Sequence, residues 1–266
     1  MMDWEYINLH AKQWVLEAGD KIRASFDKTL NIQTKSDPND LVTNMDKEIE
    51  QFFINKIREN FQNHRVFGEE GFGDEISDLN GVVWIIDPID GTMNFIHQQR
   101  NFAISLAVYE NGIGKIGIIY DVAHGELYHA INGKGAFMND TLLPALSKKS
   151  VKESIIALNA TWVMENHRID HKLLIPLVRD ARGTRSYGTA ALEMVFVATG
   201  RVDAYISMRL SPWDIAAGAV IINELGGVVT NLRGEKLDFL SNDSLLVAKP
   251  GLHETIIKDY LKEGKW

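Results

Sequence analysis

The chain begins with two helical patterns of apolar residues. Between residues 4 and 22, apolar side chains recur at spacings of three and four, which is the period of an amphipathic helix. The same period predicts a second helix from Asn44 to Asn60, whose charged residues we expect at its start or on its outer face: Asp46, Lys47, Glu48 and Glu50. The sequence therefore predicts a pair of amphipathic helices.

A series of strands follows this helix pair. Val82 to Ile86 is a continuous run of large apolar residues between Gly81 and Asp87-Pro88, which favours a fully buried strand. Asn-Gly and His-Gly turns separate the segments after it, as is typical of hairpins. We expect an antiparallel meander with further strands at residues 102–109, 115–122, 126–131 and 135–138.

Beyond residue 150, strand and helix patterns alternate. We expect strands at 154–158, 204–208, 228–230 and 244–248, and helices at 171–178, 190–199, 214–225 and 252–261. The chain has no internal repeat and no Pro/Ser-rich linker. We therefore predict one domain, 1–266, of mixed α and β class, in which two halves, 1–148 and 149–266, pack together and helices cover the sheets.

Composition narrows the function classes. With 266 residues, 45% of them hydrophobic, the chain can bury a large core, and disorder and coiled coil are excluded. It contains no cysteine, which excludes disulfides, thiolate metal sites and cysteine nucleophiles. The formal net charge of −8 argues against binding to nucleic acid or to an anionic membrane. Residues 1–26 lack the apolar core of a secretory signal, so we expect a cytoplasmic protein.

Two common motifs fail on their context. Gly112, Gly114 and Gly117 spell G-x-G-x-x-G, but a dinucleotide fingerprint must open a helix, and this one continues into a strand. His167 and His171 have the spacing of a zinc helix but lack its glutamate. Since nucleophile-elbow and phosphate-loop motifs are also absent from the sequence, we expect the chemistry to come from carboxylates.

The most informative segment runs from Asp87 to Phe95, directly after the buried strand. Pro88 biases Asp87 toward an extended conformation, and Gly91 allows a close turn. We expect the carboxylates of Asp87 and Asp90 and the carbonyl of Ile89 to converge on one point, as Mg²⁺ requires. The amides of Gly91 and Thr92 would then start a short helix and bind a phosphate.

Two further acidic features are ordinary when taken alone. Glu69-Glu70 is typical of a solvated acidic loop, and Asp214 is expected to be the N-cap of the helix at 214–225.

Taken together and in order, these segments resemble a known family. They are Asp40-Leu41-Val42-Thr43 with Asp46, Gly68-Glu69-Glu70, residues 84–95, Gly188-Thr189-Ala190-Ala191, and residues 213–217. This set resembles the inositol monophosphatase family, part of a group of Mg²⁺-dependent, lithium-sensitive phosphatases that also contains fructose-1,6-bisphosphatases and bisphosphate nucleotidases.

The resemblance implies a five-layer αβαβα sandwich of the inositol monophosphatase and fructose-1,6-bisphosphatase type, usually a homodimer. It implies two or three Mg²⁺ ions, inhibition by Li⁺, and these metal ligands: Glu69, Asp87, the Ile89 carbonyl, Asp90 and Asp214. Because four carboxylates repel one another and a phosphate ester, such a site needs cations. The resemblance also implies that a water is activated beside Glu69 and Thr92, and that Asp46 accepts a hydrogen bond from the Thr92 hydroxyl. Glu70 would support this site without binding the two main metal ions directly.

The substrate contacts implied by the resemblance are Asp90, Gly91, Thr92, Gly188, Thr189 and Ala190. In inositol-selective members a glutamate seven residues before the Trp-Asp aspartate accepts from sugar hydroxyls. Here that position is Ser207, which forms a weaker hydrogen bond. Arg185 and Arg209 could bind a second phosphate, or could form structural ion pairs.

We expect a phosphatase for small phosphate monoesters, with inositol monophosphate as the main substrate and broad specificity. The alternatives are an NADP phosphatase, a fructose-1,6-bisphosphatase and a 3'(2'),5'-bisphosphate nucleotidase. Two functions of other classes stay open, which are a non-catalytic, metal-dependent binding or regulatory protein and a dinucleotide-dependent oxidoreductase.

Overall fold

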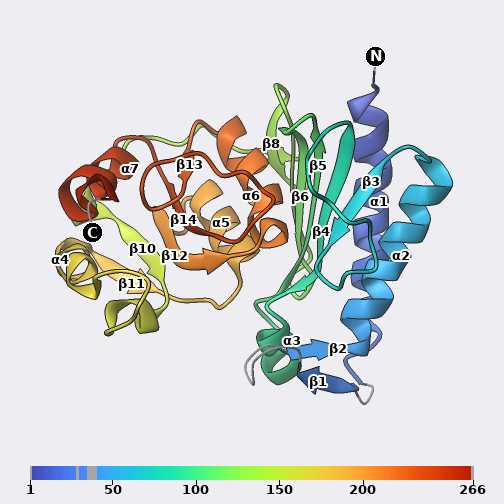
Figure 1. Ribbon diagram of the computed structural model, residues 1–266, viewed down its shortest axis with the longest axis horizontal. Coiled ribbons are helices and arrows are strands. Elements are labelled where there is room, and N and C mark those ends of the chain that lie inside the picture. Colours follow the sequence, from blue (N-terminus) through green and yellow to red (C-terminus); the bar gives the residue numbers. More distant parts are fainter. Residues whose placement is uncertain (1, 28–29, 35–40, 265–266) are drawn as a thin grey trace.

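The protein is a sandwich of five layers (Figure 1). A computed structural model describes residues 2–27, 30–34 and 41–264. The α-helices are α1 (Trp4–Arg23), α2 (Asn44–Asn60), α3 (Thr92–Gln98), α4 (Leu174–Asp180), α5 (Ala190–Ala198), α6 (Pro212–Glu224) and α7 (Leu252–Thr255). Short 3₁₀ segments lie at Val151–Glu153, Ala160–Val163, His171–Leu173 and Lys262–Gly264, and Ile256–Tyr260 forms a π turn.

The strands form two large sheets and one small hairpin. The seven-stranded sheet has the order β3 (Arg65–Gly68), β4 (Val82–Asp90), β5 (Ala103–Glu110), β6 (Ile113–Asp121), β7 (Glu126–Ile131), β8 (Gly135–Met138) and β9 (Thr141–Leu142). The five-stranded sheet has the order β11 (Gly183–Arg185), β10 (Ile155–Leu158), β12 (Ala204–Leu210), β14 (Asp243–Ala248) and β13 (Val228–Thr230). β1 (Ile32–Thr34) pairs with β2 (Leu41–Thr43).

The predicted meander is confirmed. Strands β4 to β9 pair with their sequence neighbours, all antiparallel, and β3 joins β4 in parallel. At the turn between β5 and β6, Asn111 and Gly112 both have a positive φ, 51° and 76°. Such turns match the twist of the strands they connect, which is why Asn-Gly was a reliable hairpin signal.

Helices α1 and α2 cover the outer face of the seven-stranded sheet, with Ile7, Trp14, Phe53 and Trp84 in one apolar cluster. One expectation about α2 is wrong. Glu50, which we expected at the start of the helix or on its outer face, is 0% exposed. Its carboxylate is tolerated in the core because two backbone amides donate to it.

Helices α5 and α6 lie between the two sheets. All nine residues of α5 are buried, as expected for a helix covered on every side. One apolar cluster joins these helices to residues of both sheets, and a second lies under α4 and α7 on the outer face of the five-stranded sheet. The predicted αβαβα sandwich is therefore confirmed.

Some boundaries in the second half differ from the predicted ones. The helix expected at 171–178 begins with a 3₁₀ turn and becomes α-helical only at Leu174. This start places Pro176 in the first turn, where its missing N–H costs no intrahelical hydrogen bond. The helix expected at 252–261 changes to a π turn after Thr255.

Candidate active site

The site starts at the carboxyl end of β4. In a regular strand, residues three apart point to opposite faces. Here the pairing with β5 shifts between Asp87 and Asp90, so that three steps on β4 match two on β5, from Ser105 to Ala103. The extra residue is a β-bulge. It lets Asp87 and Asp90, 2% and 8% exposed, contribute to one cluster.

Asp214 joins them from the start of α6. The prediction that Asp214 is the N-cap is wrong, because Ser211 occupies that position and Pro212 begins the helix. Proline is favoured as the first helical residue, since its missing N–H would have no helical partner there. Asp214 instead lies at the third helical position, where one oxygen, Oδ2, accepts from the Ser211 amide at 2.8 Å.

Asp87, Asp90 and Asp214 form one acidic cluster. Each offers a carboxylate oxygen, and these atoms all lie within 4.8 Å of one another. Burial raises the pKa of Asp87 well above its usual value, and repulsion from Glu69, Asp90 and Asp214 raises it further. Burial also raises the pKa of Asp90 to about 6, although hydrogen bonds from Thr189 and Ala191 oppose the shift.

This cluster fits a hard divalent cation. Buried carboxylates without a counter-charge are costly, and their ionised form is stabilised only by a cation or by hydrogen-bond donors. The ligand atoms are all oxygens, as Mg²⁺ and Ca²⁺ prefer, and cysteine is absent from the whole chain.

The loop after β3 brings Glu69 to the cluster. The Glu69 amide continues the pairing with β4 by donating to the Ile86 carbonyl at 3.2 Å. The negative charge of Glu69 raises the pKa of Asp46, Asp87, Asp90 and Asp214, so its carboxylate lies near them, although it is not one of the three whose ligand atoms lie within 4.8 Å of one another.

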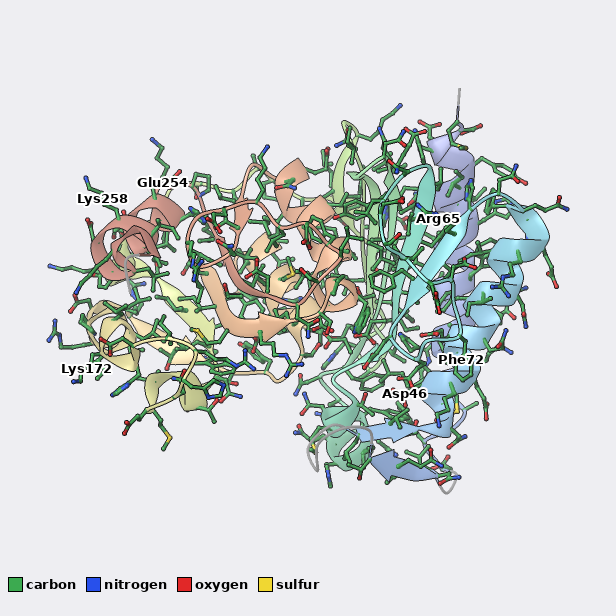
Figure 2. The ribbon with its side chains drawn as sticks, in the orientation of Figure 1. Asp46, Arg65, Phe72, Lys172, Glu254 and Lys258 are labelled. Atoms are coloured by element: carbon green, nitrogen blue, oxygen red, sulfur yellow. The ribbon has the colours of Figure 1, made fainter. Side chains whose placement is uncertain are left out.

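Glu50, on α2, holds the same loop in place. It accepts from the amides of Glu70 and Phe72 at 2.7 and 2.9 Å, and Figure 2 shows Phe72 beside α2. The spacing in α2 contains a signal for this burial, because Phe53, Ile54 and Ile57 follow Glu50 at three, four and seven residues and so share its helix face, but the charge of Glu50 led us to expect an exposed side chain.

Thr92 lies at the first position of α3, after the left-handed turn at Gly91 (φ 90°). Its Oγ1 is 3.1 Å from Oδ1 of Asp46 and 3.0 Å from the Ile89 carbonyl. Asp46 is buried in the first turn of α2, where its other oxygen accepts from the Thr43 amide at 2.8 Å. The predicted pairing of Asp46 with Thr92 is present. Asp40, which belongs to the same motif, lies outside the described residues.

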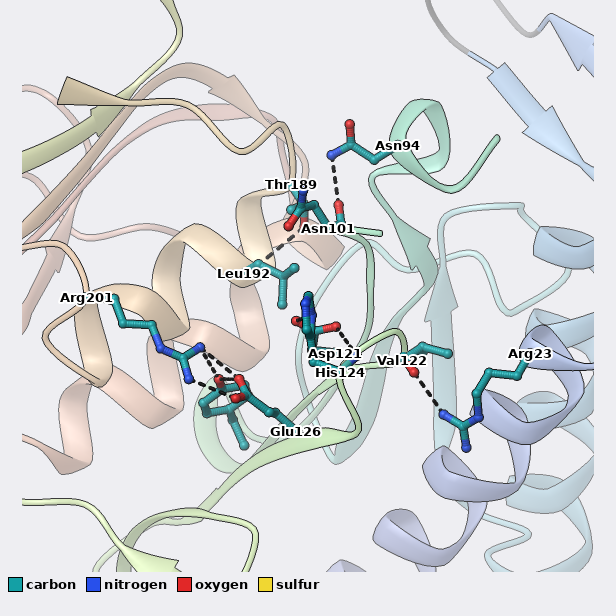
Figure 3. Close-up of polar contacts among 11 residues, drawn as sticks. Arg23, Asn94, Asn101, Asp121, Val122, His124, Glu126, Thr189, Leu192 and Arg201 are labelled. Atoms are coloured by element: carbon teal, nitrogen blue, oxygen red, sulfur yellow. Dashed lines mark hydrogen bonds and ion pairs between the residues drawn. The ribbon is translucent and has the colours of Figure 1, made fainter. Parts of the chain in front are cut away.

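The turn before α5 closes the site from the other half of the chain. The hydroxyl of Thr189 and the amide of Ala191 both donate to Oδ2 of Asp90, the amide at 2.6 Å. Asn94 holds this turn from α3, since its amide nitrogen donates to the Tyr187 carbonyl at 2.7 Å. The same nitrogen donates to the Asn101 carbonyl at 2.8 Å (Figure 3).

A cavity of about 210 Å³ adjoins the acidic cluster. Asp90 and Asp214 line one part of it, and the lining residues further include Asn159, Trp162, Gly188, Thr189, Ala190, Glu193, Tyr205 and Ser207. This volume is below the ~300–1,000 Å³ of pockets for drug-sized ligands and suits a small polar molecule.

Arg185 and Arg209 do not line this cavity. Arg185 is exposed, and its Nη1 donates to the Thr184 carbonyl at 2.7 Å. Arg209 lines a larger cavity of about 500 Å³ together with Arg168 and Arg233, which contains none of the clustered aspartates. Neither arginine lines the cavity beside the aspartates, although each is next in sequence to a residue that does, Ser186 and Leu210.

Comparison with known proteins agrees with this geometry. Residues 3–264 match the inositol monophosphatase family. The chain belongs to this family. It is similar to the inositol-1-monophosphatase of Bacillus subtilis (strain 168), with 59% identity over 265 residues that cover 100% of both chains.

Two solved structures of this family are similar along nearly the whole chain. One is inositol monophosphate-bound SaIMPase-II, with a TM-score of 0.88 and 41% identity, covering 97% of this chain and 94% of that one. The other is 2'AMP-bound SaIMPase-II, with a TM-score of 0.89 and 41% identity over 98% and 95%. This member of the inositol monophosphatase family is therefore a phosphatase, which hydrolyses phosphate monoesters.

Proposed function

We propose that this enzyme is a Mg²⁺-dependent phosphatase whose main substrate is inositol monophosphate and which also accepts other small phosphate monoesters. The observation that carries the proposal is the convergence of Asp87, Asp90 and Asp214 within 4.8 Å, beside a cavity of about 210 Å³. The relatives bound to inositol monophosphate and to 2'AMP support both the substrate and the breadth.

The proposed metal ligands are Glu69, Asp87, the Ile89 carbonyl, Asp90 and Asp214, holding two or three Mg²⁺ ions. When bound, Mg²⁺ supplies positive charge to the phosphate oxygens and the leaving alkoxide and lowers the pKa of water. Attraction between the four carboxylates and the cations then offsets the repulsion among the carboxylates. We also expect Li⁺ to inhibit the enzyme, as the family resemblance implies.

The residues proposed to activate the attacking water are Thr92 with Asp46, and Glu69 in the loop after β3. Asp46 accepts a hydrogen bond from the Thr92 hydroxyl, which turns a lone pair of Thr92 Oγ1 toward an attacking water. Glu69 accepts a proton from the same water, and Glu70 supports it from the neighbouring loop position. The chain then needs no covalent nucleophile.

The proposed substrate contacts are Asp90, the amides of Gly91 and Thr92, the segment Gly188–Ala190, and Ser207. The segment and Ser207 line the cavity, and Ser207 offers a hydroxyl to a sugar or inositol ring. A bisphosphate or NADP would need a further cationic contact, and Arg185 and Arg209 lie outside the cavity lining. This favours monoesters of a single ring over the alternatives.

We further propose that residues 1–266 form one domain with packed halves 1–148 and 149–266, and that the protein is a cytoplasmic homodimer. The apolar cluster shared by the two sheets supports the first proposal. Among the described residues, no helix combines the length and the apolar character that crossing a bilayer requires.

The test is phosphate release from inositol 1-phosphate, fructose 1,6-bisphosphate, 2'-AMP, adenosine 3',5'-bisphosphate and NADP. Each is assayed without Mg²⁺, with Mg²⁺, and with Mg²⁺ plus Li⁺. We expect Mg²⁺-dependent release that is fastest for inositol 1-phosphate. A preference for a bisphosphate or NADP would support the alternatives, and no release by folded, Mg²⁺-bound protein would favour a binding role.

A further inference from the structure

Two buried glutamates hold the two loops that form the site. Resting on the proposed function, we propose that Glu50 and Glu193 are positioning residues with separate effects. Glu50 fixes the loop that carries Glu69 and thereby sets the affinity for Mg²⁺. Glu193 fixes the turn at Tyr187–Thr189 and thereby sets the affinity for the substrate.

Two kinds of contact hold the carboxylate of Glu50 in place, which are hydrogen bonds from backbone amides and close packing by Gly68. Its two oxygens accept from the amides of Glu70 (2.7 Å) and Phe72 (2.9 Å). Gly68 packs against the same carboxylate so closely that a Cβ on this residue would lie 2.4 Å from the carboxylate carbon. Bonds from amides to an ionised carboxylate are about twice as strong as neutral ones. The backbone on both sides of Glu69 is therefore fixed by a side chain that need not touch the metal.

Glu193 performs the same task on the other half of the chain. It lies in the first turn of α5, is 4% exposed, and lines the cavity beside Tyr205 and Ser207. Its Oε1 accepts from the Tyr187 amide at 2.6 Å. Gly188, the next residue, has a φ of 77° and lines the cavity itself. Release of the Tyr187 amide would therefore loosen the wall against which the substrate lies.

The two effects are separable because Asp90 has an anchor that Glu193 does not control. Oδ2 of Asp90 accepts from the Thr189 hydroxyl in the turn and also from the Ala191 amide at 2.6 Å. Ala191 belongs to α5, whose backbone is held by helical hydrogen bonds. A loosened turn thus leaves Asp90 in place, whereas a loosened Glu69 loop moves one of the metal ligands.

The experiment compares Glu50→Gln and Glu193→Gln, which keep the size of the side chain but remove its charge and one acceptor. Calorimetric titration measures the Kd of Mg²⁺, and phosphate release from inositol 1-phosphate at saturating Mg²⁺ gives kcat and KM. For Glu50→Gln we expect the Kd of Mg²⁺ to rise by about tenfold or more, as for residues that orient metal ligands, with KM within about twofold. For Glu193→Gln we expect KM to rise about tenfold, because the amide oxygen that remains accepts from the Tyr187 amide without the charge of the carboxylate, with the Kd of Mg²⁺ within about twofold.

Glu224→Gln is the matched control. Glu224 ends α6, and its two oxygens accept from the amides of Gly133 and Gly135 at 2.8 and 2.9 Å, in a turn between β7 and β8. It lies ten residues after Asp214 on the same helix, about 15 Å along the axis. We expect a lower Tm with both constants within about twofold of the wild type.

The proposal is overturned if Glu50→Gln and Glu193→Gln change both constants together, or change them no more than Glu224→Gln does. If a glutamine variant does not fold, Glu50→Asp or Glu193→Asp, which shortens the side chain, is expected to show the same split. A wild-type protein that binds Mg²⁺ but releases no phosphate would refute the proposed function alone. The Mg²⁺ titration of the Glu50 variant would then still test the role of Glu50.

Discussion

The two carboxylate oxygens of Asp90 have different roles. Thr189 and Ala191 both donate to Oδ2, so we expect Oδ1 to be the atom that this residue offers to a metal. The Asp90 carboxylate thus connects the end of β4 to the start of α5. Its raised pKa reflects burial beside other carboxylates, which is the environment of a group that works with a cation bound.

We expect Asp90→Asn to abolish Mg²⁺-dependent turnover while the chain stays folded. The amide oxygen of the asparagine can still accept from Thr189 and Ala191, but the charge that attracts the cation is gone. Phosphate release with increasing Mg²⁺, alongside circular dichroism and a thermal melt, measures both effects. Near-normal turnover by this variant would contradict the assignment of Asp90 as a ligand.

We expect Thr92→Ala to lower kcat by about 100-fold or more and to change KM much less. The reason is that the hydroxyl acts on the attacking water rather than on bound substrate. Thr92→Ser, which keeps the hydroxyl beside Asp46, should retain most of kcat. An unchanged kcat with only KM altered would show that Thr92 binds substrate instead.

At the scale of elements, the contact between α6 and β6 explains the glycine pattern that resembled a dinucleotide motif. A Cβ on Gly117 would lie 2.3 Å from the Ala217 carbonyl of α6, and one on Gly114 would lie 2.6 Å from Val220. The glycines let the helix approach the sheet backbone. This close packing matters for function because the same helix carries Asp214 to the cluster.

We expect Gly117→Ala to lower the free energy of unfolding by about 1–3 kcal/mol, since backbone atoms of α6 must move to admit the methyl group. Urea unfolding measures the change. Gly183→Ala is the control, because the nearest atom to its Cβ is Arg185 Nη1 at 3.7 Å and no clash arises. Equal stability of the two variants would mean that α6 adjusts at no cost.

At the scale of the whole molecule, the sequence predicted the layers better than the contacts between them. The meander followed from its turn residues, and the buried helices followed from their composition. The position of Glu50, the bulge at Asp87–Asp90 and the capping role of Asp214 did not. The bulge depends on pairing with Ser105, and the buried carboxylate of Glu50 depends on the amides of Glu70 and Phe72, which are all far away in the sequence. Asp214 caps through Ser211, only three residues before it, and there the predicted helix start was two residues late. The local pattern predicted that Asp87 and Asp90 converge, and only the family resemblance added Asp214 to them.

An ion pair between Arg201 and Glu126, the first residue of β7, links the two halves of the chain (Figure 3). Arg201, after α5, donates through Nη1 and Nη2 to the two oxygens of Glu126 on β7, at 2.8 and 2.9 Å. The same guanidinium lies 5.2 Å from the centre of the Phe196 ring. The hydrogen bond from Arg201 is the main cause that lowers the pKa of Glu126 below its usual value.

We expect Glu126→Gln to lower the free energy of unfolding by no more than about 1 kcal/mol at pH 7, because the pair is partly exposed and screened by solvent. The pKa of Glu126 is lower in the folded state than in the unfolded one. Its stabilisation is therefore complete above the unfolded pKa, near 4.5, and is lost as pH falls through the folded value. The difference from the wild type should shrink as pH is lowered from 7 to below 4.5.

Urea unfolding of both proteins across this pH range measures the trend. Glu5→Gln is the control, since Glu5 pairs with Lys134 within the first half and both side chains are well exposed. It should change stability little at any pH. A loss for Glu126→Gln that stays constant down to acidic pH would show that the contact acts through packing on Phe196 and Tyr128 rather than through charge.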